Sequence, residues 1–166
     1  MDNQLILDLI GILEQENRVY DDILKISKNK TNIIIEGKVS ELESIVKLEQ
    51  SLVLQMGKLE SQREEMIEKM SGFLKVDPAD ITITELMKYL EPGQAMKLKG
   101  VQDKLGNTLK ELKGANELNS KLIKNSLDYI SFSVNILTDA GTGSNNYGHS
   151  GQVGDSKKRS FFDIKL

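Results

Sequence analysis

The sequence has no cysteine, no tryptophan, one histidine and two prolines, and only 5% of its 166 residues are aromatic. Without cysteine, the chain has no disulfides, thiol catalysis or cysteine-ligated metals, and it fits a reducing compartment. With so few aromatic residues, the core has to come from Leu, Ile, Val and Met, which suits helices packed along their length. The scarcity of proline agrees with long helices.

Long hydrophobic runs and a strong net charge are also missing. No window approaches the roughly 20 apolar residues of a membrane span, and a start that carries Asp2 and Asp8 lacks the basic leader of a secretory signal. The formal net charge of −3 gives no reason to expect a nucleic-acid partner, although Lys157–Arg159 form a small basic cluster. We expect a cytoplasmic protein with no membrane insertion and no nucleic-acid partner.

No group of residues resembles an active site. His149 has no cysteine or second histidine to bind a metal with, and no glycine loop has the spacing of a phosphate site. Carboxylate pairs such as Glu64 and Glu65 fall where a helix has a charged outer face. We therefore expect no enzyme activity, no catalytic residue, no metal and no cofactor.

The first half of the chain has the apolar periodicity of two long helices, at about 3–36 and 39–73. Gly37 is suited to end the first helix, and Ser40 with Glu43 matches a capping box at the start of the second. Polar residues interrupt the first seam at Asn17, Ser27 and Thr31, and the second at Glu49 and Arg63. The apolar positions are Ile6, Ile10, Leu13, Tyr20, Leu24 and Ile34 in the first seam, and Leu42, Ile45, Leu52, Met56, Leu59, Met66, Met70 and Phe73 in the second.

A connector with both prolines precedes the last long helix. Thr82 and Glu85 match a second capping box, which predicts a short helix at about 83–90. The third long helix is expected at about 94–138. The predicted fold class is all-α: an elongated antiparallel helical hairpin plus a third long helix, packed as a coiled-coil-like three-helix bundle.

The end of the third helix has more apolar residues than one neighbour can cover. Between Leu127 and Leu137 the apolar side chains project in every direction, which is typical of a helix that binds a partner. Alternatively, the first two helices or a second copy of the chain cover them. Asn116 and Asn119 lie on the seam of the same helix, where they form a polar layer between helices, bind the backbone of a bound segment, or do both.

After Leu137 the composition becomes rich in Gly, Ser and Asn. Such a segment buries too little apolar surface to offset its ordering entropy, so we divide the chain into a helical domain at 1–138 and a flexible C-terminal tail at 139–166. In the last residues, FFDIKL, apolar and charged residues alternate. Phe162, Ile164 and Leu166 fall on one side, as a strand that joins another sheet requires.

Several of these segments together resemble the FlgN family of flagellar type III export chaperones. They are the helical hairpin with IIIEGKVSELESIVKLEQSLVLQMGKLESQRE, a helix with N-x-x-N and NSLDYI, a tail with YGHSGQ, and the FFDIKL ending. The resemblance implies a cytoplasmic chaperone that binds the C-terminal segments of the hook-filament junction proteins FlgK and FlgL, prevents their premature assembly and delivers them to the export gate protein FlhA.

The resemblance also implies two sets of site residues. The client-binding residues would be Asn116, Asn119, Leu122, Ile123, Leu127, Ile130 and Val134. The residues that dock on the export gate would be Tyr147, Gly148, Gly151 and Gln152.

The alternative is a structural coiled-coil adaptor or a self-assembling helical protein, in which the same apolar helix end is a homotypic interface. The two classes differ in oligomeric state. An adaptor forms stable dimers or larger assemblies, whereas a chaperone is a monomer or a weak dimer.

Overall fold

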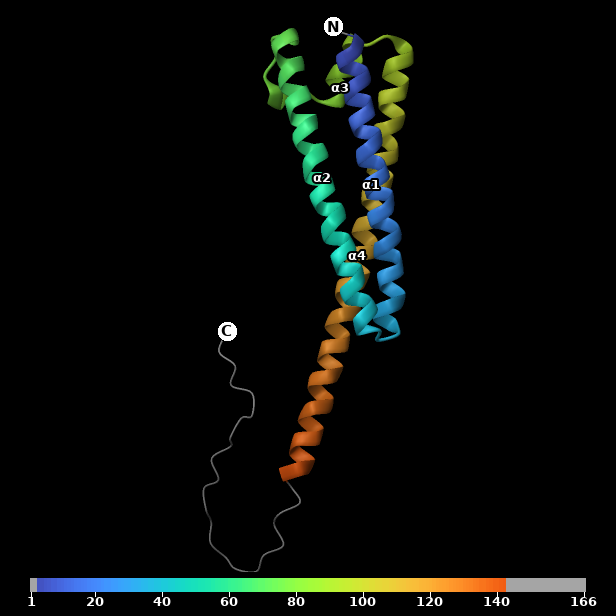
Figure 1. The fold of residues 1–166 in the computed structure, drawn as a ribbon, viewed down its shortest axis with the longest axis vertical. Helices are drawn as coiled ribbons and strands as arrows, with labels where there is room; N and C mark the ends of the chain where they lie inside the picture. The colour runs from blue at the N-terminus through green and yellow to red at the C-terminus, as the bar shows by residue number, and fades with distance from the viewer. Residues whose placement is uncertain (1–2, 143–166) are drawn as a thin grey trace, which may run out of the picture. The chain divides into compact units, whose positions relative to one another are not determined.

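The computed structural model describes residues 3–142, and every regular element in this range is helical (Figure 1). The α-helices are α1 (Asn3–Ile35), α2 (Val39–Leu74), α3 (Ile83–Leu86) and α4 (Pro92–Thr142), and two 3₁₀ turns are η1 (Pro78–Asp80) and η2 (Met87–Tyr89). No strand occurs between residues 3 and 142, and the all-α class is confirmed.

The chain divides into two units, residues 1–127 and 128–166, with the boundary inside α4. The first unit holds α1, α2, α3 and the first part of α4, and the second unit is described up to Thr142. Residues 139–142, which we expected in the tail, belong to α4. The rest of the predicted tail lies outside the described residues.

A tight turn at Gly37 joins α1 to α2. Gly37 ends α1 as predicted: it adopts the left-handed conformation, with φ of 68°, and its N–H donates to the Ile34 carbonyl at 3.1 Å. The predicted cap at Ser40 is wrong, because the turn closes early and Lys38 occupies the N-cap position without a side-chain hydrogen bond. Ser40 is thus already inside the helix.

The second predicted cap is correct. Thr82 has extended backbone, and its Oγ1 accepts the N–H of Glu85 at 3.1 Å. The predicted helix at 83–90 is, however, one turn of α-helix followed by the 3₁₀ turn η2. α4 then begins at Pro92, slightly earlier than predicted, and proline suits a first helical position because its missing N–H has no partner there.

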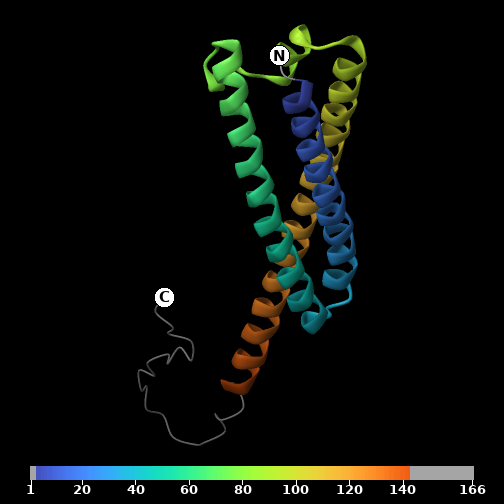
Figure 2. The same ribbon diagram turned by 45° about the horizontal axis from the view of Figure 1, so that its top comes forward.

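The buried core of the first unit gathers where α3 packs against the start of α1, the end of α2 and the start of α4 (Figure 2). Met70 and Leu98 have no exposed surface. Burial of each such side chain contributes about 1.5–3 kcal/mol. The core consists of Ile6, Leu9, Ile10, Leu13, Met70, Leu86 and Leu98.

One residue of the predicted second seam is exposed. Phe73 is 64% exposed, while Met70 is buried and Leu74 packs against the core. At 3.6 residues per turn, Leu74 lies about 40° around the helix from Met70 on one side and Phe73 lies about 60° on the other. The last turn of α2 faces the core with Met70 and Leu74 and turns Phe73 outward.

We predict opposite effects of alanine at two glycines. Gly37→Ala forces a left-handed alanine and should lower the free energy of unfolding by roughly 1 kcal/mol. Gly57 lies inside α2 with open space around an added Cβ, so Gly57→Ala should raise the free energy of unfolding by about 0.5–1 kcal/mol. Urea unfolding of both variants measures these changes. A change of the same sign in the two free energies of unfolding would contradict the left-handed conformation assigned to Gly37.

Candidate protein-binding site

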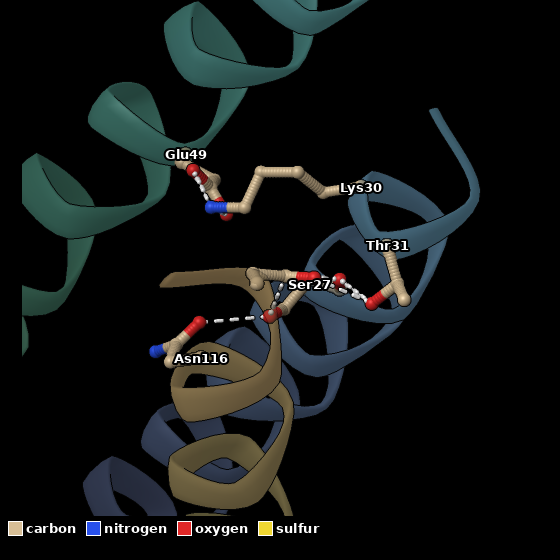
Figure 3. Close-up of polar contacts among 6 residues, drawn as sticks. Ser27, Lys30, Thr31, Glu49 and Asn116 are labelled. Atoms are coloured by element: carbon tan, nitrogen blue, oxygen red, sulfur yellow. Dashed lines mark hydrogen bonds and ion pairs between the residues drawn. The ribbon is translucent and has the colours of Figure 1, made fainter. Parts of the chain in front are cut away.

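A polar layer joins α1 to α4 (Figure 3). Ser27 Oγ donates to Asn116 Oδ1 at 2.8 Å, and Thr31 Oγ1 donates to Asn119 Oδ1 at 2.6 Å. The Asn119 amide donates to the Ser27 carbonyl at 2.8 Å, and the Asn119 side chain is almost fully buried. Both asparagines thus form the polar layer that was one of the two interpretations. Whether either also contacts a client stays a prediction.

Two ion pairs join α1 to α2 where the second seam is interrupted. Lys30 Nζ lies 2.6 Å from Glu49 Oε1, and these side chains are only 15% and 20% exposed (Figure 3). Arg63 Nε lies 3.0 Å from Glu16 Oε1. Removing one partner from such a sheltered pair leaves an uncompensated charge, so the pairs oppose sliding of the two helices.

Asp21 and Tyr20 of α1 have pKa values that their contacts with other helices or their burial shift. A hydrogen bond from Lys104 at 2.6 Å, assisted by one from Thr108 at 3.1 Å, lowers the pKa of Asp21 against the opposing effect of burial. Burial raises the pKa of Tyr20, and the nearby carboxylates of Glu16 and Glu60 add to this effect. Tyr20 lines an apolar hollow of about 330 Å³ that holds none of the predicted site residues.

A groove of about 310 Å³ brings three predicted client residues, Asn116, Asn119 and Ile123, together with side chains of α1 and α2. Lys30 and Glu49, the ion pair described above, also line it. All the lining residues belong to the first unit. They are Ile23, Lys30, Glu49, Val53, Asn116, Asn119, Ser120 and Ile123.

The sequence analysis missed the contribution of α2 to this groove. Val53 is 61% exposed and falls beside the predicted seam of α2. A signal for it exists, because Val39, Val46 and Val53 recur every seven residues and all three are exposed. Such spacing puts them on one stripe of the helix, next to the stripe that packs on α1.

The apolar side chains toward the end of α4 are exposed. From Leu127 to Leu137 none of the large apolar side chains is buried, and their exposed fractions lie between 41% at Val134 and 73% at Leu137. Of the remaining predicted client residues, Ile123, Ile130 and Val134 are exposed and Leu122 is half-buried. The predicted gate-docking residues, Tyr147, Gly148, Gly151 and Gln152, lie outside the described residues.

Three hydroxyl groups on this part of α4 are bonded within the helix. Ser126 Oγ donates to the Leu122 carbonyl at 2.9 Å, and Ser133 Oγ donates to the Tyr129 carbonyl at 2.9 Å. Thr138 Oγ1 bonds back by one turn in the same way, at 2.8 Å.

Two kinds of site were sought in the described residues: a metal site and a membrane-spanning helix. Between residues 3 and 142, no three carboxylate or imidazole groups converge in a way that could hold a metal ion. In the same range, no helix combines the length and the apolar character that crossing a membrane requires.

Comparison with known families and proteins assigns the chain. The family described as FlgN protein matches residues 1–154. The chain belongs to the FlgN family. This FlgN-family chain is also similar to a protein of Bacillus subtilis (strain 168) named uncharacterized protein YvyG. The two are 28% identical, and the match covers 93% of this chain and 97% of that protein. No solved structure matches the chain.

Membership of the FlgN family confirms the resemblance found in the sequence. FlgN is a family of chaperones, so membership indicates a chaperone role in the flagellum and the binding of flagellar proteins.

The polar layer yields a stability prediction. Asn119→Ala leaves the Thr31 hydroxyl and the Ser27 carbonyl without this buried partner, and it should cost about 1–3 kcal/mol of unfolding free energy. Asn116→Ala is the matched control, because this more exposed amide makes one bond in the layer and should cost about 0.5–1.5 kcal/mol. Urea unfolding measures both, and a larger loss in the control would contradict the assignment.

The Asp21 pKa yields a pH prediction. Because the folded state lowers this pKa, the stabilisation is complete above the ordinary aspartate pKa of about 3.9 and is lost as pH falls through the folded value. Asp21→Asn should therefore destabilise the chain at neutral pH and have progressively less effect in acid. Urea unfolding across that pH range tests this. Lys104→Met, which removes the main hydrogen-bond donor, should weaken the same pH dependence; an unchanged dependence would contradict the assignment.

Proposed function

We propose that this chain is a flagellar export chaperone that binds the C-terminal segments of FlgK and FlgL, prevents their premature assembly and delivers them to the export gate protein FlhA. The observation that carries the proposal is the run of exposed apolar side chains on α4 in a chain of the FlgN family. A helix with such a surface is suited to bind an amphipathic segment of another protein. The proposed role is binding in the cytoplasm, without catalysis or a cofactor.

The groove supports one location for the client on the first unit. Val53 of α2 and Ile123 of α4 supply apolar side chains to it, and the Lys30–Glu49 pair lines it. An amphipathic client helix that places an apolar residue between Val53 and Ile123 would bury both. Helix-in-groove binding of this kind needs no preformed sheet edge.

The other proposed client residues lie farther along α4, or in the polar layer. Leu127, Ile130 and Val134 offer exposed apolar surface, and Leu122 offers a part of its side chain. Asn116 and Asn119 lie next to these residues in sequence. Because the Asn119 amide bonds to α1, its proposed contribution is to hold α4 in position, whereas the more exposed Asn116 can exchange its bond to Ser27 for one to a client.

The proposed arrangement for this task is the antiparallel hairpin of α1 and α2 with α4 as the third helix of a coiled-coil-like bundle. A bundle of this kind holds the groove open without the client, so binding does not have to order it. The affinity is set by packing in the groove more than by its area, which allows a client to be released without ATP.

The export gate would be contacted by another segment. We propose that Tyr147 is the aromatic anchor and that Gly148, Gly151 and Gln152 shape the backbone around it. Separate segments for client and gate allow both to be bound at once, with the second contact favoured by the high effective concentration that tethering provides.

A specific observation also favours the alternative of a coiled-coil adaptor. The exposed stripe of Val39, Val46 and Val53 has the seven-residue spacing of a coiled-coil seam. Oligomeric state separates the two functions, since an adaptor would be a stable dimer or larger assembly, whereas the proposed chaperone is a monomer or weak dimer that forms a one-to-one complex with its client.

Calorimetry with a C-terminal fragment of FlgK tests the proposed function. We expect one-to-one binding at micromolar Kd or tighter. Val53→Asp and Leu127→Asp should each weaken it by about tenfold or more, because each places a charge in an apolar contact. Leu48→Asp is the matched control, since Leu48 is similarly exposed on α2 but lies about 140° around the helix from Val53.

The outcomes separate the alternatives. All three variants should keep the helix content of the parent by circular dichroism, and Tyr147→Ala should keep client affinity. Equal losses in Leu48→Asp and Val53→Asp would reject the groove. No binding by the parent chain, together with a stable homo-oligomer, would reject the chaperone function in favour of the adaptor.

A further inference from the structure

We propose that the segment Phe161–Leu166 of this chain binds the apolar end of α4, defined as residues 129–137, and that a client has to displace it. The displacement by a client rests on the proposed function, whereas the contact between the two parts of the chain does not. Both parts belong to the second unit of the chain.

The apolar end of α4 presents more exposed apolar surface than a helix usually keeps without a partner. Within nine residues it carries six large apolar side chains, each at least 41% exposed. They are Tyr129, Ile130, Phe132, Val134, Ile136 and Leu137.

The sequence after α4 contains one dense apolar segment that could cover this surface. Between Thr142 and Ser160 the large apolar residues are Tyr147 and Val153, whereas four of the next six residues are apolar: Phe161, Phe162, Ile164 and Leu166. In an extended conformation the alternation puts Phe162, Ile164 and Leu166 on one side. Residues 3–142 contain no strand that this segment could extend, so its apolar side is matched within the described chain by a helix surface.

The connection is long enough to turn back. Tyr129 lies about 20 Å from Thr142 along the axis of α4, at 1.5 Å per residue. Residues 143–160 can span up to about 60 Å when fully extended. Because the two parts are joined by a tether of this length, each sees the other at an effective concentration on the order of millimolar, which favours even a weak contact.

The segment Phe161–Leu166 also matches the apolar end of α4 in length and in the charges at its ends. Asp128 and Asp139 flank the apolar end of α4 and lie about 16 Å apart along the helix. The extended segment Phe161–Leu166 spans about 17 Å, with the basic cluster Lys157–Arg159 before it and Lys165 within it. Basic residues can therefore lie near each carboxylate while the apolar side chains cover the surface between them. Such exposed pairs orient the segment more than they strengthen its binding.

The contact would regulate the same surface that the proposed function uses. A client binds only the open fraction of molecules, so its apparent affinity falls in proportion to the occupancy by Phe161–Leu166. The segment would also shield the surface from other chains when no client is bound.

The absence of cysteine makes a direct test possible in the full chain. Ser160→Cys provides a single site for a nitroxide label. We expect the amide signals of residues 129–137 to lose about half or more of their intensity compared with the reduced label, as for a segment bound most of the time. The matched control carries the same label with Phe162→Asp and Ile164→Asp, which should restore the signals.

Two results would overturn the contact. One is that the signals of the parent and of the control are broadened to the same extent, or not at all in either. The other is broadening that appears only when labelled chains are mixed with unlabelled, isotope-enriched chains, which would assign the contact to a second copy.

The FlgK fragment then tests the displacement separately. The Phe162→Asp, Ile164→Asp chain should bind it several-fold more tightly than the parent does, because its surface is open. Equal affinities would overturn the displacement. If the signals are broadened but the chain binds no client, the proposed function is rejected and the contact stands. If the chain binds the client but the signals are not broadened, the contact is rejected and the proposed function stands.

Discussion

The buried amide of Asn119 fixes how α4 lies on α1. An apolar interface between two long helices tolerates a shift of one turn, because leucine and isoleucine pack acceptably against many neighbours. The Asn119 amide does not, since it has to face both the Ser27 carbonyl and the Thr31 hydroxyl to avoid an unpaired polar group in the interface. Asn119 therefore helps to set where the groove lies along α4.

Polar contacts fix the register of both long helices that pack on α1. Toward α2 it carries Glu16 and Lys30, and toward α4 it carries Asp21, Ser27 and Thr31, so each neighbour is held in register by polar contacts on either side of an apolar stretch. Asn17 is the exception. Its amide N–H donates to the Val101 carbonyl at 3.1 Å, but its Oδ1 is buried without a partner in the described chain, which makes this the least satisfied polar group of the interface.

Periodicity predicted the helices because it depends on which residues share a face, and it failed where a neighbour decides which face is covered. Phe73 shares the predicted stripe but is turned away from the core that Met70 and Leu74 contact, while Val53 lies outside the stripe and lines the groove. The two capping boxes show a similar limit. Thr82 has the extended backbone that a cap needs, whereas the turn at Gly37 starts α2 before Ser40. The asparagines were recognisable as a seam anomaly, but their partners on α1 required coordinates.

The hydroxyl groups that bond back within α4 have a consequence for selectivity. With Ser126, Ser133 and Thr138 donating to carbonyls of their own helix, these hydroxyls do not direct their hydrogens toward a partner. A surface of this kind distinguishes ligands by size and amphipathic pattern, and a missing methylene in such a contact changes affinity only modestly. In the proposed function, these three hydroxyls therefore add little to the choice between related client sequences.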